Sequence, residues 1–149
     1  MTLIVYLSGE IHTDWREQIL AGAKGLDVTF SAPVTDHAAS DDCGVAILGA
    51  EPDKFWHDRK GALVNAIRTR KGIEDADVVV VRFGDKYKQW NAAFDAGIAY
   101  ALGKSMIILQ PPEHDHALKE VNAAALAVAR EPGQVVDILR YVLDGTLPK

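Results

Sequence analysis

Val78–Phe83 reads VVVVRF and is the stretch that decides the fold. Consecutive β-branched valines without polar alternation are typical of a strand covered on both faces, as central strands of parallel sheets are. Gly84 and Asp85 end this run. The alanine-rich residues Trp90–Leu102, closed by Gly103, then predict a helix. A buried strand followed by a helix indicates a parallel α/β sheet.

The same alternation of short apolar runs and helix-like stretches continues on both sides of this unit. The expected strands are Leu3–Leu7, Val28–Ser31, Met106–Leu109 and Leu126–Ala129. The expected helices run from Asp14, with Glu17 completing a capping box, to about Ala23; over Lys54–Glu74; over about His116–Ala123; and from Glu131-Pro132 to about Leu143.

Five strands joined by helices imply right-handed crossovers and helices on both faces of the sheet. The sequence therefore predicts a flavodoxin-like, three-layer α/β/α fold with strand order 2-1-3-4-5, formed by residues 1–149 as one domain. One segment does not fit the alternation. Pro33–Asp53 has no sustained period and is rich in polar residues, so we expect a long functional loop or lid there.

Composition favours an ordinary globular domain. The chain has 149 residues, 48% of them hydrophobic and 25% charged, and a net charge of −5. Cys43 is the single cysteine, so no internal disulfide forms and a reducing compartment is suitable. The first residues lack a basic region typical of signal peptides, and the longest apolar stretch, Ala123–Ala129, is too short to span a bilayer. We expect a cytoplasmic protein without a membrane partner.

Charge is unevenly distributed along the chain. Residues 51–88 hold nine Lys or Arg against seven Asp or Glu, whereas the rest of the chain is acidic. A nucleic-acid binder would show a denser basic stripe, so nucleic acid is not an expected partner. The segment is either a solvated helical face or the surroundings of a small anionic ligand.

In a sheet of the predicted order, ligands bind where strands 1 and 3 end, because the winding of the chain reverses there. The loops concerned are Ser8–Thr13 and Gly84–Lys88. Neither holds a GxxxxGK[ST] phosphate loop or a GxGxxG fingerprint, so the common nucleotide motifs are absent.

Asp95 is the candidate catalytic residue on composition. It is the only charged residue between Gln89 and Gly103, within a helix otherwise suited to burial. Asn91 precedes it by four residues and shares its helical face. A carboxylate in such surroundings is either kept for chemistry or serves as a structural group that exploits the helix dipole.

These residues resemble a known superfamily. Tyr6-Leu7-Ser8-Gly9 and Phe94-Asp95-Ala96-Gly97-Ile98-Ala99 are similar to the Tyr-x-x-Gly and acid-x-Gly-x-Ala segments of nucleoside 2-deoxyribosyltransferases. Longer stretches resemble the YtoQ family within that group. They are Pro33-Val34-Thr35-Asp36-His37, Asn65-Ala66-Ile67-Arg68-Thr69-Arg70 and the residues from Arg82 to Asn91.

The resemblance implies roles for residues of both loops. Asp95 falls on the nucleophile position and Tyr6 on the tyrosine that orients the carboxylate. Sugar or 5′-phosphate binding falls on the loop after the first strand and on Arg16, that is, on Ser8, Gly9, Glu10, His12 and Arg16. The chain departs from the superfamily in having Asp rather than Glu as nucleophile, in lacking an acid-x-Gly before it, and in having Arg68-Thr69 near the place of a further acid.

The expected activity is cleavage or transfer of an N-glycosidic bond in a nucleoside, nucleotide or related glycoside. Further expected substrate-binding residues are Asp36, His37, Arg68, Asp85 and Asn91, and Asp36, Asp41 or Asp85 would protonate the leaving base. Neither a cofactor nor a metal is expected, and the resemblance implies a homo-oligomer. The alternatives are a non-catalytic nucleotide-sensing domain, and a metal site formed by His37, Asp41, His114 and His116.

Overall fold

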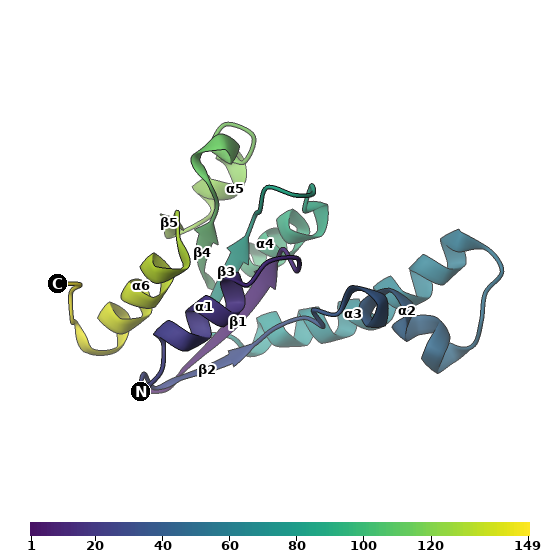
Figure 1. Cartoon of the computed structure of the whole chain (residues 1–149), viewed down its shortest axis with the longest axis horizontal. Helices are drawn as coiled ribbons and strands as arrows, with labels where there is room; N and C mark the ends of the chain where they lie inside the picture. The colour runs from purple at the N-terminus through teal and green to yellow at the C-terminus, as the bar shows by residue number, and fades with distance from the viewer.

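The computed structural model describes residues 1–149 and contains a five-stranded sheet in the order β2-β1-β3-β4-β5, with every neighbouring pair parallel (Figure 1). This confirms the predicted fold class and strand order. The strands are β1 Leu3–Gly9, β2 Val28–Ser31, β3 Val78–Arg82, β4 Ser105–Leu109 and β5 Ala127–Ala129. The helices are α1 Trp15–Gly22, α2 His37–Leu48, α3 Lys54–Asp75, α4 Trp90–Ala101, α5 Lys119–Ala123 and α6 Pro132–Asp144, with a 3₁₀ turn at Pro112–His114.

β3 lies at the centre of the sheet and is buried from both sides, as its valine run predicts. Val78 and Val80 join the core beneath α1 and α6, whereas Val79 and Val81 join the core beneath α3 and α4. Because successive side chains of a strand point to opposite faces, one valine run supplies both cores. The two helical layers therefore pack on a shared central strand.

The predicted loop over Pro33–Asp53 is wrong, because most of it is helix α2. Asp36 caps this helix, its carboxylate accepting a hydrogen bond of 2.8 Å from the N–H of Ala39. α2 packs on α3 through glycines: a Cβ on Gly44 would lie 2.3 Å from the backbone nitrogen of Gly61. A helix that packs through glycines needs no stripe of large apolar residues, so the usual helical period is missing.

Two smaller expectations at helix ends are also wrong. Asp14 precedes α1 but its side chain accepts no capping bond; it accepts instead from Gln18, at 2.8 Å. The helix expected over His116–Ala123 is shorter, since α5 begins only at Lys119. By contrast, a full capping box forms at α6 between Glu131 and Gln134.

α4 is not buried all round as its composition indicated. Its alanines Ala92, Ala96 and Ala99 face the sheet, and Trp90 and Phe94 are exposed to solvent. Small side chains allow the helix to lie close to β3, so the large aromatic rings point away from it. α4 thus presents an aromatic outer surface.

α2 and the first half of α3 form an arm that projects away from the sheet (Figure 1). α2 packs along α3, and only the later part of α3 reaches β1 and α4. No helix of the structure has the length and hydropathy that crossing a membrane requires.

Candidate functional site

The carboxyl ends of β1 and β3 meet at the predicted point of the sheet. Gly9 pairs with Arg82 in register, and the N–H of Glu10 donates to the carbonyl of Arg82 at 3.1 Å. The chain turns sharply here, with φ of 108° at Gly9. A Cβ at this position would lie 2.3 Å from the carbonyl oxygen of Arg82, so only glycine allows the two strands to approach this closely.

Asp95 and Ser8 form the central contact of the site. The hydroxyl of Ser8 donates to Oδ2 of Asp95 at 2.7 Å, joining α4 to the end of β1. Ser8 is fully buried and Asp95 is partly buried. Burial raises the pKa of Asp95, and the Ser8 hydrogen bond partly opposes that shift. Oδ1 of Asp95 has no hydrogen-bond partner, so one carboxylate oxygen is held and the other is free.

Tyr6 precedes Ser8 by two residues on β1, so both side chains lie on the same face of the sheet. Its ring packs on α3 where Gly72 leaves room, because a Cβ there would lie 2.4 Å from the ring. Its hydroxyl is buried without a hydrogen-bond partner. Burial raises the pKa of Tyr6, and the charge of Asp95 adds to the shift. The nearby side chain of Thr69 lowers the pKa of Tyr6 and so offsets part of this rise. No hydrogen bond of good geometry joins the two hydroxyls.

In the structure, therefore, Ser8 rather than Tyr6 donates the hydrogen bond that orients Asp95. The buried Tyr6 hydroxyl is a donor without an acceptor, which is an uncommon and costly state for such a group. It is available to a ligand or to the carboxylate.

Glu10 and Arg16 brace the loop after β1 from the inside. The Glu10 carboxylate accepts from the N–H of His12 and from the hydroxyl of Thr13, both at 2.9 Å. The Arg16 guanidinium donates to the carbonyls of Leu7, Gly9 and Glu10, at distances from 2.6 to 3.1 Å. Burial lowers the pKa of Arg16 to about 10. Both charged groups are thus engaged by the loop itself.

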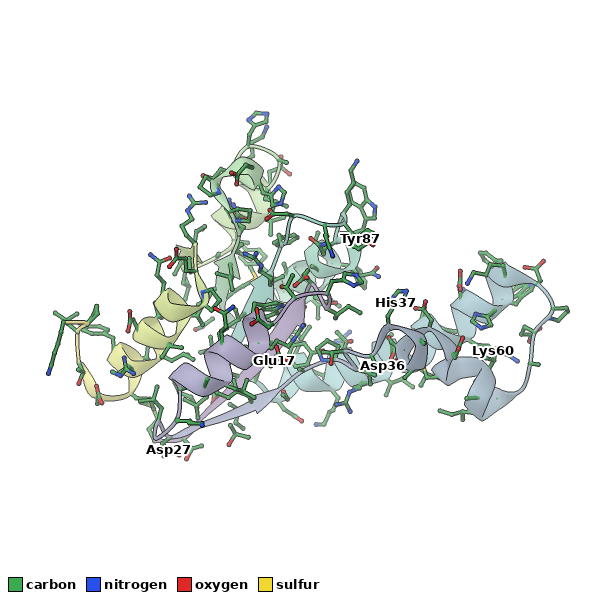
Figure 2. The ribbon with its side chains drawn as sticks, viewed as in Figure 1. Glu17, Asp27, Asp36, His37, Lys60 and Tyr87 are labelled. Atoms are coloured by element: carbon green, nitrogen blue, oxygen red, sulfur yellow. The ribbon has the colours of Figure 1, made fainter.

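His12 lies between two further aromatic rings. Its ring centroid is 4.7 Å from that of Tyr87 and 5.8 Å from that of His37. The three exposed rings come from three segments: the β1–α1 loop, the start of α2 and the β3–α4 loop. Figure 2 labels two of these residues, His37 and Tyr87. We call His12, His37 and Tyr87 the aromatic cluster. His12 places the cluster on the loop that follows β1, the strand that carries Ser8.

The remaining predicted residues are more scattered. Arg68 is exposed and donates to the carbonyl of Ala32 at 3.3 Å, and Asn91 is exposed without a side-chain hydrogen bond. Asp85 is exposed, 3.9 Å from Nε2 of His114. Asp36 is occupied as the helix cap, and Asp41 pairs with His37 at 3.2 Å.

Three residues of the site are missed by the sequence reasoning. Gly72 and Thr69 seat Tyr6, and Tyr87 belongs to the aromatic cluster. Tyr87 lies in the long stretch that resembles the YtoQ family, which is the one signal that could have found it. No group of three or more His, Cys, Asp or Glu side chains is placed to hold a metal ion, so His37 and Asp41 do not join His114 and His116.

Replacing Asp95 by Asn is expected to raise the free energy of unfolding at pH 7. Because burial raises the pKa of Asp95, the folded state binds its proton more tightly than the unfolded state does. Wild-type stability therefore falls as the pH rises from about 4 through the raised pKa, and Asn removes this loss. Urea unfolding of both proteins between pH 4 and 8 measures the effect, which should disappear at the acidic end. A difference that is independent of pH would contradict it.

The sheet is doubly wound and parallel, and a partly buried carboxylate lies beside the switch point, where the strand order reverses. These features define a class of small α/β proteins that bind ligands at the carboxyl ends of the strands. Comparison with known proteins then identifies the family. A family model described as nucleoside 2-deoxyribosyltransferase YtoQ matches residues 6–143. The chain belongs to this family, which confirms the resemblance.

One relative and two solved structures are similar to this chain. The uncharacterized protein YtoQ of Bacillus subtilis (strain 168) is 40% identical over 146 residues, covering 97% of this chain and 99% of that protein. Among solved structures, a 2-deoxyribosyltransferase from Bacillus psychrosaccharolyticus has a TM-score of 0.58 at 17% identity, covering 90% of each chain. The CMP N-glycosidase BcmB of Clostridium botulinum has a TM-score of 0.53 at 13% identity, covering 94% of this chain and 99% of that one. These structures share the fold.

Proposed function

We propose that this protein cleaves or transfers an N-glycosidic bond of a nucleoside, nucleotide or related small glycoside, with Asp95 as the nucleophile. The observation that carries the proposal is the Asp95–Ser8 pair, a partly buried carboxylate held by one oxygen at the switch point of the sheet. Support comes from the family description and from the fold shared with a 2-deoxyribosyltransferase and a CMP N-glycosidase.

The geometry suits a two-step reaction. Oδ1 of Asp95 forms a bond to the anomeric carbon while the bond from that carbon to the base nitrogen breaks, and the base leaves with the bonding electron pair. A loop acid protonates the departing base. Water or a second base then attacks the same carbon and releases Asp95 as a carboxylate. Ser8 holds Oδ2 throughout, which keeps the attacking oxygen in place.

The other predicted residues take roles that follow from their contacts. Tyr6, whose buried hydroxyl lacks a partner, would donate to the sugar or to Asp95. Asp85 is the acid we propose for the leaving base, because it lies in the loop between β3 and α4 and its contact with His114 is long, at 3.9 Å. Asp36 caps a helix, and Asp41 pairs with His37 at 3.2 Å. Glu10 and Arg16 would act by shaping the loop that surrounds the sugar or its 5′-phosphate.

The aromatic cluster offers a surface for the base. His12→Ala is expected to raise KM for a nucleoside or nucleotide substrate by roughly 10-fold, because stacking on an aromatic ring contributes about 1–3 kcal/mol per base. kcat should change much less, since His12 does not contact Asp95. Steady-state kinetics measure both constants. His116→Ala, at an exposed histidine without a side-chain hydrogen bond or ion pair, is the matched control. An equal effect of the two substitutions would contradict the role of His12.

The proposed activity is tested by incubating the protein with a panel of nucleosides and nucleotides and measuring release of free base by chromatography. Transfer is detected by adding a second base and following the new nucleoside. Absence of release from every member of the panel would count against an enzyme.

A non-catalytic nucleotide sensor is the second candidate. The observation that favours a sensor is that Asp95 is shorter than the Glu of the superfamily, so its carboxylate reaches less far. One oxygen of this carboxylate is also engaged by Ser8. A thermal-shift screen separates the two functions, because a ligand that binds only the folded state raises the midpoint of unfolding. Stabilisation by nucleotides without turnover would support the sensor.

We also propose that the protein acts in the cytoplasm as a homo-oligomer, without cofactor or metal. The cytoplasmic location is supported by the single cysteine, Cys43, which is unpaired as is usual in a reducing compartment. The aromatic outer surface of α4 supports self-association. Light scattering at micromolar concentration tests the oligomer, and a monomeric mass would overturn it.

A further inference from the structure

Arg82 is a half-buried cation without a partner in the chain. Its Nε–H group is buried and has no hydrogen-bond acceptor, and its two terminal nitrogens, which are not buried, make no hydrogen bond or ion pair. A charge that is partly withdrawn from water is costly unless an opposite charge or an acceptor compensates it. Since the chain supplies no such group, we expect a ligand to supply it.

The other arginines are engaged or lie elsewhere. Two of them donate to backbone carbonyls and three pair with carboxylates; they are Arg16, Arg68, Arg70, Arg130 and Arg140. Arg59 also lacks such a contact, but it is exposed on the arm formed by α2 and the first half of α3. Arg82 is therefore the arginine that remains free at the carboxyl edge of the sheet.

Arg82 lies at the strand end where the candidate site is built. It is the last residue of the central strand and pairs in register with Gly9 of β1. Its side chain leaves β3 on the same face as Val80, towards α1, whereas Asp95 lies on α4 at the other face. Arg82 and Asp95 thus flank the strand end at which sheets of this order bind their ligands.

The carboxylates near this strand end are engaged by other donors. The N–H of Glu10 donates to the carbonyl of Arg82 at 3.1 Å, but the Glu10 carboxylate accepts from two groups of its own loop, at 2.9 Å each. Asp95 accepts from Ser8 at 2.7 Å. Neither carboxylate forms an ion pair with Arg82. The positive charge is thus left for an anion that the chain does not contain.

We propose that Arg82 forms an anion subsite of the candidate site and binds a phosphate group there. The inference deepens the proposed function, on which it rests for the position of the sugar at Asp95. A guanidinium presents a planar fork of N–H donors that matches the oxygens of a phosphate. Arg16, the sequence-based candidate for this role, is occupied by carbonyls of the loop, so Arg82 takes the role instead.

Two sources of phosphate fit this subsite. One is the 5′-phosphate of a nucleotide substrate. The other is free phosphate that resolves the glycosyl-enzyme. In that case a phosphate oxygen bonds to the anomeric carbon while the bond between this carbon and Oδ1 of Asp95 breaks, which releases a sugar 1-phosphate and leaves Asp95 as a carboxylate. Both sources place the same anionic group beside Arg82.

Isothermal titration calorimetry tests the subsite without requiring turnover. The probes are 2-deoxyribose 5-phosphate, 2-deoxyribose and inorganic phosphate. Arg82→Met removes the charge and keeps a long side chain. It is expected to raise the dissociation constant for 2-deoxyribose 5-phosphate by roughly 10- to 100-fold, as loss of charge-assisted hydrogen bonds does, and to leave binding of 2-deoxyribose unchanged. Equal dissociation constants of wild type and Arg82→Met for the sugar phosphate would overturn the subsite.

Arg59→Met is the matched control, because it removes a second unpaired guanidinium that lies on the arm. It should leave binding of all three probes unchanged, and an equal effect of the two substitutions would overturn the inference. Thermal unfolding without ligand separates binding from a structural role. Since the charge of Arg82 is unpaired, Arg82→Met should leave the midpoint unchanged or raise it. A lowered midpoint would assign Arg82 to the fold and overturn the subsite.

The probes also identify the source of the phosphate. Binding of the sugar phosphate at least about 10-fold more tightly than inorganic phosphate supports a nucleotide substrate. Base release from nucleosides that inorganic phosphate accelerates, with formation of a sugar 1-phosphate, supports phosphate as the acceptor. Phosphate binding that depends on Arg82 without base release from any substrate would overturn the catalytic proposal and leave the subsite. Base release by a wild type that binds neither phosphate probe would overturn the subsite alone.

Discussion

Asp95→Ala is expected to reduce base release from the best substrate of the panel by about 10³-fold or more. The substitution removes the partly buried carboxylate that Ser8 holds at the switch point, and with it the proposed covalent step. Ser8 then loses its acceptor, but its small hydroxyl remains in place. Single-turnover measurements with excess enzyme isolate the chemical step from product release.

Asp95→Asn and Asp137→Asn are the matched controls. Asn at position 95 keeps an oxygen that accepts from Ser8 but is not a nucleophile, so activity should fall as far as with Ala while the protein stays folded. Asp137 lies on α6, on the other face of the sheet, where it pairs with Arg140 at 3.1 Å. Its replacement should leave turnover unchanged. Residual activity of Asp95→Asn close to wild type would remove Asp95 from the mechanism.

Gly9→Ala is expected to lower the free energy of unfolding by about 3 kcal/mol or more, or to prevent folding. Two independent causes act at this residue. A φ of 108° is strained for any side chain, and the added Cβ would lie 2.3 Å from the carbonyl oxygen of Arg82. β1 and β3 would have to separate at the site, so binding should be lost together with stability.

Gly97→Ala is the control for this substitution. Gly97 lies within α4 in ordinary helical geometry, and a Cβ there would meet nothing within 4 Å. Alanine at that position should stabilise the protein by about 0.5–1 kcal/mol. Urea unfolding of the three proteins under one condition gives the comparison. Equal stabilities of Gly9→Ala and wild type would mean that the turn at Gly9 relaxes at little cost.

The strands and their order are predictable from the sequence for a clear physical reason. A central strand such as β3 must be apolar on both faces, so its signal is continuous and does not depend on its neighbours. Val28–Ser31 is assigned with the bounds that the structure has. Because strands and helices alternate along the chain and their crossovers are right-handed, few orders of the strands in the sheet remain possible.

α2 could not be predicted in this way, because its packing does not involve a large apolar face. Its closest contact with α3 runs through Gly44 and Gly61, and Asn65 adds hydrogen bonds to Ser40 at 3.0 and 3.2 Å. Glycine and serine are residues that usually indicate loops. Only the partner helix makes this segment a helix.

The site was predictable in its outline but not in its internal contacts. Asp95 stands out because it is alone in an uncharged helix, and this signal needs no structure. The partners of Arg16 are backbone carbonyls of a loop, which have no signature in a sequence. The same holds for Ser8, whose role depends on the distance between β1 and α4.

The two outer strands of the sheet have a consequence for how copies of this protein can assemble. β2 has four residues and β5 only three, so each edge offers few unpaired backbone groups to another chain. Long, flat edges invite strand addition and open-ended growth, and short edges discourage both. The sheet edges therefore offer almost no template for fibre-like stacking of sheets from neighbouring copies.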